Sequence, residues 1–316
     1  MEDLEQLILG APRTLSTEAL LARVDLDPEL VRAVWAALGF AVVDDDQVAF
    51  TELDLKALGD SAALLSSGVV DTSTWLVMAR TMGQGLSRLA EAQLEVFRRT
   101  AAALDPDDVE QTIAGVAPLV LPRIEALLVY NWRRQFAAAV GRAFAGEREP
   151  GELPTLAVGF VDIVDYTRTI RGWDAEQLER TLEAFERGVS LRVGAAGGRV
   201  VKTLGDGVLY TTGGSVSAVE VALETVEAHA ADDALPKVRA GVATGPVLER
   251  LGDVYGSPVN LASRLCDEAR PLSVLVDRTA AADLDGAPGL RVRELERRSV
   301  RGFRSLHPFL VRRDAD

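Results

Sequence analysis

The sequence is poor in cysteine, histidine and lysine. Cys266 is its single cysteine, which excludes an internal disulfide framework and fits a reducing compartment. Of the two histidines, His229 and His307, neither belongs to a motif that suggests pH sensing. Because only three lysines are present, at positions 56, 202 and 237, a lysine inside a motif is more informative than usual.

Positive charge is also in short supply. The formal net charge is −14, so the chain as a whole lacks the positive field that attracts nucleic acid or anionic lipid. The first residues are acidic and carry no basic secretion-signal region, and no apolar run approaches the roughly 18 to 20 residues of a membrane span. We therefore expect a cytoplasmic protein with no membrane span and no nucleic acid partner.

With 316 residues and 48% apolar content, the chain is long enough for about two domains. Residues 145–154 concentrate charged residues, glycine and proline, a composition typical of a linker. We predict an all-α regulatory and dimerisation domain at residues 1–145, a linker at residues 146–154, and a second domain at residues 155–316.

The start of the chain resembles a helix-turn-helix with a small wing. Helical patterns at residues 17–23 and 28–35 precede an apolar run at 40–43, an acidic turn, and a second apolar run at 48–50. Acidic residues outnumber basic ones across residues 1–58, whereas helix-turn-helix DNA readers need a cationic face. A transcription factor is therefore the disfavoured alternative, and a regulatory subdomain at residues 1–58 is preferred.

Two long helices are predicted next, at residues 73–104 and 107–144, from apolar residues spaced three and four apart. Pro118 and Pro122 should kink or interrupt the second helix. Its residues 116–130 are apolar nearly all round, which predicts burial in a helix bundle or a dimer interface. Simple packing and a pocket for a small-molecule or lipid-like effector both remain open.

The second domain alternates strand and helix patterns, which predicts an α+β fold of the ferredoxin-like kind, with helices covering an antiparallel sheet. The predicted strands lie near residues 156–161, 200–204, 208–212, 238–243, 247–250 and 274–276, and the predicted helices at residues 175–193, 217–230 and 260–269.

Two aspartates stand at predicted strand edges. Asp162 ends the first strand of the second domain, and Asp206 lies in a tight turn between two β runs. Alone, each would more often be a helix cap or a turn residue. Brought side by side, two hard carboxylates are what a pair of Mg²⁺ or Mn²⁺ ions needs alongside phosphate oxygens.

A third segment, residues 252–264, leads from a turn into a helix. Asn260 and Arg264 are four residues apart there, so both project from one helix face and can reach a single ligand. A helix cap and a surface ion pair are the alternative roles of these two residues.

Together these segments resemble the catalytic domain of the class III adenylyl and guanylyl cyclases, over residues 153 to about 313. The resemblance implies two Mg²⁺ or Mn²⁺ ions per active site and a distinct role for each matching residue. The implied metal positions are Asp162, Asp206 and Ile163, the purine contacts Lys202 and Asp253, the ribose contact Asn260, the transition-state donor Arg264, and the terminal-phosphate contact Arg301.

The resemblance also implies ATP as substrate, cyclic AMP and pyrophosphate as products, and a homodimer with active sites at the subunit interface. A lysine donor and an aspartate acceptor complement N1 and the 6-amino group of adenine, whereas guanine reverses this pattern. A guanylate cyclase is one alternative. A non-catalytic nucleotide-sensing homologue is another, but such a chain would typically lack a metal aspartate or the arginine.

Overall fold

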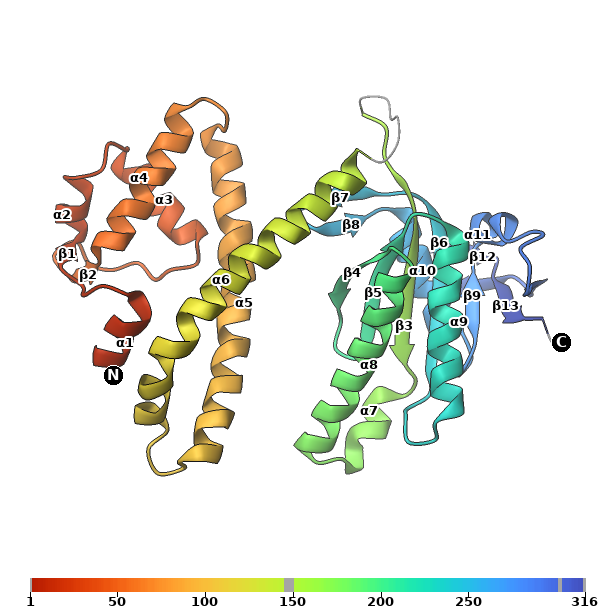
Figure 1. The fold of residues 1–316 in the computed structure, drawn as a ribbon. Helices are drawn as coiled ribbons and strands as arrows, with labels where there is room; N and C mark the ends of the chain where they lie inside the picture. The colour runs from red at the N-terminus through yellow and green to blue at the C-terminus, as the bar shows by residue number, and fades with distance from the viewer. Residues whose placement is uncertain (1, 145–150, 301–302, 315–316) are drawn as a thin grey trace. The chain divides into compact units, whose positions relative to one another are not determined.

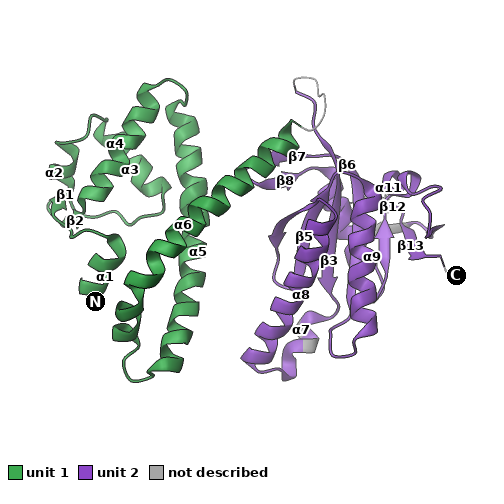
Figure 2. Ribbon diagram, viewed as in Figure 1, with its two compact units in different colours: residues 1–147 green, residues 148–316 purple. Residues whose placement is uncertain are grey.

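The computed structural model describes residues 2–144, 151–300 and 303–314. The chain forms two compact units, residues 1–147 and residues 148–316, as Figure 2 shows. The division falls in the segment predicted as a linker. The first unit is mostly helical and the second is α+β (Figure 1), so the predicted fold classes are confirmed in outline.

The first unit begins with short elements around a small core. They are α1 (Glu2–Leu9), β1 (Leu15–Ser16), α2 (Thr17–Leu21), α3 (Pro28–Ala37), β2 (Val48–Phe50) and α4 (Glu52–Ser66). Side-chain caps begin the helices: Asp27 accepts from the Glu29 N–H ahead of α3, and Thr51 forms a capping box with Asp54 at α4. Leu20, Val34 and Phe50 are buried between these elements.

The small wing expected after α3 is not present as predicted. The run at residues 40–43 forms no strand, and β2 instead pairs antiparallel with β1. Trp35 accounts for this difference, because its indole N–H donates to the Ala41 carbonyl at 2.9 Å and its ring contacts that of Phe40. The run therefore packs against α3, and the two-stranded sheet corrects the prediction of an all-α unit.

Every basic side chain in residues 2–58, all of which the structure describes, is paired with an acid. The pairs are Arg13 with Glu5 at 2.5 Å, Arg23 with Glu52 at 2.6 Å, Arg32 with Asp45 at 3.4 Å, and Lys56 with Asp60 at 2.8 Å. A helix-turn-helix reader needs cations free to meet phosphates. These exposed ion pairs are weak, and the absence of a nucleic acid partner stays a prediction.

Two long helices complete the unit, α5 (Thr72–Leu104) and α6 (Val109–Ala143). Asp71 caps the first and Asp108 the second through backbone N–H groups one turn on. The helix α6 runs through Pro118 and Pro122, so of the kink or interruption expected there the interruption does not occur. Each proline removes one backbone donor, and the remaining hydrogen bonds of a 35-residue helix hold the segment together.

Most apolar side chains of α6 are exposed on the single chain, so the predicted burial of residues 116–130 within a helix bundle is contradicted for the exposed ones among them, and burial in a dimer interface stays a prediction. The largest exposed ones are Leu119, Leu127, Val129, Tyr130, Trp132 and Phe136. Between Ile113 and Trp132 only Arg123 and Glu125 are charged.

By length and composition α6 could cross a membrane, so the expectation that no segment reaches that threshold is wrong. Length and composition alone are weak evidence, and they do not make α6 a membrane span.

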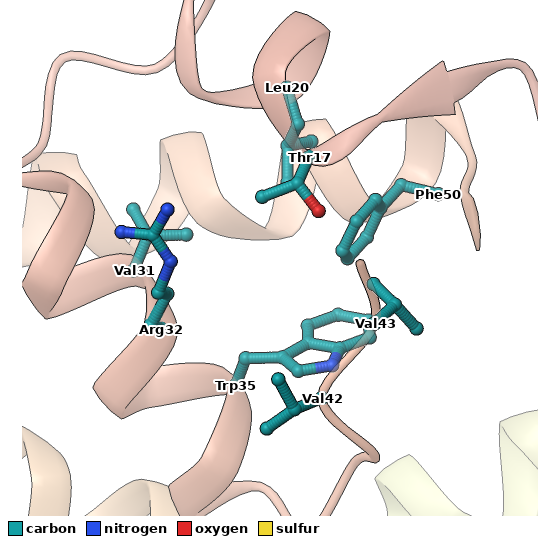
Figure 3. A pocket seen from close by; sticks show the side chains of 8 residues that line it. All are labelled: Thr17, Leu20, Val31, Arg32, Trp35, Val42, Val43 and Phe50. Carbon is teal, nitrogen blue, oxygen red and sulfur yellow. The ribbon is translucent and has the colours of Figure 1, made fainter. Parts of the chain in front are cut away.

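A cavity of about 90 Å³ lies between α2, α3 and β2 (Figure 3). Its walls are mainly apolar, with Trp35 and Phe50 among them, and the Arg32 side chain stands at its edge. The Thr17 hydroxyl points into it, is buried, and has no hydrogen-bond partner. An unpaired buried hydroxyl is costly, and a ligand that accepted or donated one hydrogen bond there would remove that cost.

The second unit is built on a seven-stranded sheet of order β10-β13-β9-β6-β3-β5-β4. The strands are β3 (Thr155–Ile163), β4 (Arg199–Thr203), β5 (Gly207–Thr212), β6 (Val238–Pro246), β9 (Val274–Val276), β10 (Leu290–Glu294) and β13 (Phe309–Arg313). All neighbours are antiparallel except β6 and β9, so the sheet is mixed rather than purely antiparallel as expected. Two hairpins lie outside it, β7 (Leu248–Arg250) with β8 (Asp253–Tyr255), and β11 (Arg298–Val300) with β12 (Phe303–Leu306).

Helices cover both faces of this sheet. α8 (Ala175–Ala195) and α9 (Ser215–Ala231) pack on one face, and α10 (Ser257–Glu268) packs on the other. Three short helical segments, α7 (Tyr166–Thr169), the 3₁₀ turn Ile170–Gly172 and α11 (Arg278–Asp283), were not predicted. Because side chains alternate along a strand, Val161 and Ile163 of β3 enter the α8–α9 core, and Asp162 projects to the α10 face.

Candidate active site

Asp162 and Asp206 come together at one edge of the central strands. Asp162 is opposite Gly207 in the β3–β5 pairing, and Asp206 immediately precedes Gly207. The Ile163 N–H donates to the Asp206 carbonyl at 2.9 Å, which fixes the turn against the end of β3. Gly205 makes this tight turn with a φ of +74°, a conformation that favours glycine.

The Asp162 carboxylate is three-quarters buried, with 25% of its side chain exposed. Burial raises its pKa, hydrogen bonds from Arg239 oppose that rise, and the negative charge of Asp206 adds to it. The net pKa is raised. Two carboxylates in this setting need a cation between or beside them, and Arg239 is the cation that the chain itself supplies.

Arg239 was missed by the sequence reasoning. It lies directly opposite Asp162 in the β3–β6 register, and its Nε and Nη2 atoms donate to Asp162 Oδ2 at 3.1 and 2.8 Å. A charged residue alternating with buried Val238 and Ala240 was the available signal, because it places a cation on the same sheet face as Asp162.

The residues fit divalent cations of the Mg²⁺ class. Asp162 and Asp206 offer hard oxygen ligands, and Ile163, whose side chain is buried, could contribute only its backbone carbonyl oxygen. Among the described residues no group of three or more histidine, cysteine or acidic side chains gathers to hold a metal. The set is thus incomplete without water and phosphate oxygens, as is usual for Mg²⁺ bound with a nucleotide.

Lys202 and Asp253 meet although 51 residues separate them in sequence. Lys202 Nζ lies 2.5 Å from Asp253 Oδ2, which joins the end of β4 to the start of β8. Arg199 reinforces the junction by donating to the Gly252 carbonyl at 2.6 Å. The two residues predicted to contact the purine are therefore adjacent.

This pairing sets the charge state of Asp253. Burial alone would raise the pKa of its carboxyl, but the Lys202 ammonium, the Val254 N–H and the Arg199 charge together lower it. Asp253 is therefore ionised at neutral pH and acts only as an acceptor, while Lys202 acts as a donor.

Asn260 and Arg264 lie one turn apart on α10, as predicted. The helix buries Pro258, Ala262 and Leu265 against the sheet, so the Asn260 side chain is exposed and that of Arg264 half-exposed. Arg264 Nη1 donates to Asp267 Oδ2 at 2.9 Å.

Arg301, the predicted terminal-phosphate contact, lies outside the described residues. In the part of the chain that is described, no hydrogen bond or ion pair connects the Lys202–Asp253 pair with Asp162. The structure thus brings the candidate residues together as separate groups, the two aspartates, the Lys202–Asp253 pair, and the exposed face of α10.

The fold and these groups define a nucleotidyl cyclase domain. The family model of the adenylate and guanylate cyclase catalytic domain matches residues 149–312. The chain therefore belongs to the class III adenylate and guanylate cyclase family, and the prediction of a class III cyclase enzyme is confirmed.

Relatives with assigned names are similar over nearly the whole chain. An adenylate cyclase of Streptomyces coelicolor is 41% identical over 286 residues, covering 89% of this chain and 74% of the relative. An adenylate cyclase of Glutamicibacter nicotianae is 32% identical over 324 residues, covering 97% and 80%. The solved catalytic core of a rhodopsin-guanylyl cyclase with converted specificity, in complex with ATPalphaS, is 23% identical with a TM-score of 0.48, covering 52% of this chain and 99% of that one.

Proposed function

We propose that this chain converts ATP to 3′,5′-cyclic AMP and pyrophosphate. The contact between Lys202 and Asp253 carries the choice of ATP, because it presents one donor and one acceptor side by side. The names of the relatives from Streptomyces coelicolor and Glutamicibacter nicotianae, both adenylate cyclases, support the same substrate.

Adenine fits this pair and guanine does not. Lys202 can donate to N1 of adenine while Asp253 accepts from the 6-amino group. Guanine offers an acceptor at O6 and a donor at N1, so the same positions would leave polar groups partly unpaired. Sites that hydrogen-bond a substrate strongly reject analogues that leave such groups unpaired.

Replacing Lys202 with methionine tests base selection. The variant keeps the length of the side chain but loses the donor, so the ratio of kcat/KM for ATP to that for GTP is expected to fall at least about tenfold. Product formation with each nucleotide, followed by mass spectrometry, measures the ratio. The matched control is Lys237→Met, which makes the same change at an exposed lysine. An unaltered ratio in Lys202→Met would contradict the assignment.

The remaining residues divide the chemistry between them. Two divalent cations at Asp162 and Asp206 would lower the pKa of the ribose 3′-hydroxyl and neutralise the triphosphate for in-line displacement. Asn260 would orient the ribose. Arg264 would donate two parallel N–H bonds to the oxygens on which charge builds up around the α-phosphorus, an interaction stronger in the transition state than in the ground state.

We propose that the enzyme works as a homodimer with two equivalent active sites at the subunit interface. In this arrangement one subunit supplies Asp162 and Asp206, and its partner supplies Asn260 and Arg264. The chain carries both sets, so two identical subunits complete each other under twofold symmetry.

The first unit is proposed to regulate the enzyme and to contribute to dimerisation. Val129, Trp132, Phe136 and Val140 of α6 are exposed at spacings of three and four residues, and the Trp132 and Phe136 rings stack. Such a stripe fits a second copy of the same helix. A change in how the two copies of α6 pack would then alter the alignment of the catalytic units.

Deleting residues 1–150 tests this regulation. The specific activity of residues 151–316 is expected to differ markedly from that of the full chain, at least about fivefold in either direction, because the coupling between regulatory and catalytic parts typically has that size. Both proteins are compared at equal dimer content, determined by sedimentation. Equal specific activity per dimer would rule out a regulatory role for the first unit.

For an effector, we propose the cavity beside Thr17. Its volume of about 90 Å³ suits a small apolar molecule with one polar group and excludes a long acyl chain.

Thr17→Val is expected to stabilise the ligand-free protein by about 1 kcal/mol in urea denaturation, because it removes an unpaired buried hydroxyl. Isobutanol, used as a probe ligand, should raise the free energy of unfolding of the wild type more than that of the variant. A destabilised variant would show that the hydroxyl is satisfied and the cavity is not a site.

We also propose a cytoplasmic location, since the substrate is ATP and a second copy of the chain can cover the apolar stripe of α6. Recovery of the full chain in the soluble fraction after lysis without detergent is the expected result. Recovery with the membranes, resistant to high salt, would contradict it.

A further inference from the structure

Four charged residues form a continuous row between the sheet and α10. They are Asp162, Arg239, Asp267 and Arg264. Arg239 binds Asp162 through two hydrogen bonds, and its Nη1 donates to the Asp267 carbonyl oxygen at 2.6 Å. The Asp267 carboxylate then binds Arg264 at 2.9 Å. The row therefore leads from a candidate metal ligand to the candidate transition-state arginine within one chain.

A close approach of α10 to β6 holds this row together. A Cβ atom at Gly241 would lie 2.3 Å from both the Ala262 carbonyl oxygen and the Cys266 amide nitrogen, so only glycine allows the helix to sit this near. Arg239 is two residues from Gly241 on the same face of the strand. The tight packing therefore places the last turn of α10, with Asp267, against the Arg239 guanidinium.

Two guanidinium groups have access to the Asp267 carboxylate. Its Oδ2 is bound by Arg264, whereas its Oδ1 lies 4.0 Å from Arg239 Nη2, at the limit of an ion pair. Arg239 thus makes its short contacts with the Asp162 carboxylate and touches Asp267 chiefly through the backbone. The Asp267 side chain is half-exposed, and its two carboxylate oxygens each lie near a different arginine.

A divalent cation at Asp162 would change which carboxylate Arg239 binds. It would take the carboxylate oxygens that Arg239 now uses and would repel the guanidinium, since both are positive. The Asp267 carboxylate is the nearest alternative partner of Arg239 that the structure shows. If Arg239 took it, Arg264 would lose its only ion pair in the described part of the chain.

We propose that Asp267 is a positioning residue that holds Arg264 until metal and nucleotide take Asp162 from Arg239, and that it thereby couples the two active sites of the dimer. The inference rests on the proposed function, in which Asp162 and Arg264 of one chain serve different sites. Loading of the first site releases the arginine that completes the second. Because binding linkage is reciprocal, the two sites then bind nucleotide with positive cooperativity.

Asp267→Asn tests this coupling, because it keeps the shape of the side chain and removes its charge. Binding of the unreactive analogue α,β-methylene-ATP with Mg²⁺ is measured by calorimetry on the full-length protein. The wild type is expected to give a Hill coefficient between 1 and 2. Asp267→Asn should give a value near 1 and a lower half-saturating concentration, since Arg264 no longer has to be released. Asp267→Glu, which restores the charge, should return the coefficient above 1.

The control is Asp233→Asn, the same change at an exposed aspartate far along the chain, which should bind like the wild type. Non-cooperative binding by the wild type, or unchanged cooperativity in Asp267→Asn, would overturn the inference. A fall in kcat of Asp267→Asn as large as that of Arg264→Ala would also overturn it, because it would place Asp267 in the chemistry itself. If the wild type bound the analogue but formed no cyclic AMP from ATP, the proposed function would fail, while the binding curves would still decide the coupling.

Discussion

Replacing Asp162 with alanine is expected to lower cyclic AMP formation at least about 1,000-fold in either Mg²⁺ or Mn²⁺. The change removes one of the two carboxylates proposed to hold the cations, and a bound cation contributes several kcal/mol of charge stabilisation in such sites. Raising the metal concentration should not restore the rate, because Asp206 alone leaves too few oxygen ligands. Initial rates over a metal titration measure the effect.

Asp162 also neutralises Arg239, so the alanine variant loses a largely buried ion pair and its folding must be checked by circular dichroism. Asp162→Asn is the better matched change, because the amide keeps the shape and still accepts a hydrogen bond from Arg239. Asp233→Ala, at an exposed position, should behave like the wild type. A folded Asp162→Asn protein that kept more than about a tenth of the rate would show that Asp162 does not hold the cation.

Arg264→Ala is expected to lower kcat by about 100- to 1,000-fold and to change KM much less. These are the losses seen when one donor to a developing negative charge is removed. The reason is that Arg264 is paired with Asp267 before nucleotide binds, and its bonds to the phosphate oxygens are weak in the ground state and strengthen in the transition state. Steady-state kinetics with ATP separate the two parameters.

Arg264→Lys serves as the conservative comparison. A lysine retains the charge but cannot make two parallel hydrogen bonds, so kcat should recover only in part. A rise in KM at constant kcat in Arg264→Ala would instead show that the arginine binds ground-state ATP, and the assigned role would be wrong.

The sequence predicted the catalytic unit well because its signals there are local. Strand and helix periods place most elements of residues 155–276 to within a few residues, and the pairing of Lys202 with Asp253 followed from the family resemblance. Arg239 and Asp267 were missed, because their importance depends on which strands are neighbours and on how α10 packs against β6. The alternation around position 239 places its side chain on one face of the sheet but does not indicate that Asp162 lies opposite it.

The first unit was harder to predict for a related reason. Residues 40–43 have the composition of a strand, but a hydrogen bond from the Trp35 indole holds them against α3. In α6 the prolines suggested a kink or an interruption, and the helix is not interrupted at either. Its apolar residues were expected to be buried, but many of them are exposed on the single chain. The sequence pattern of one chain does not specify whether a second molecule covers them.

Mixing two inactive variants tests the central claim most directly. Asp162→Ala and Arg264→Ala proteins are each purified, combined in equal amounts, allowed to exchange subunits and assayed for cyclic AMP. If the sites lie between subunits, half of the dimers are mixed and each has one intact site, so about a quarter of the wild-type activity should return. If the mixture stays as inactive as its components while subunit exchange is verified, each site is built within one chain and the account is wrong.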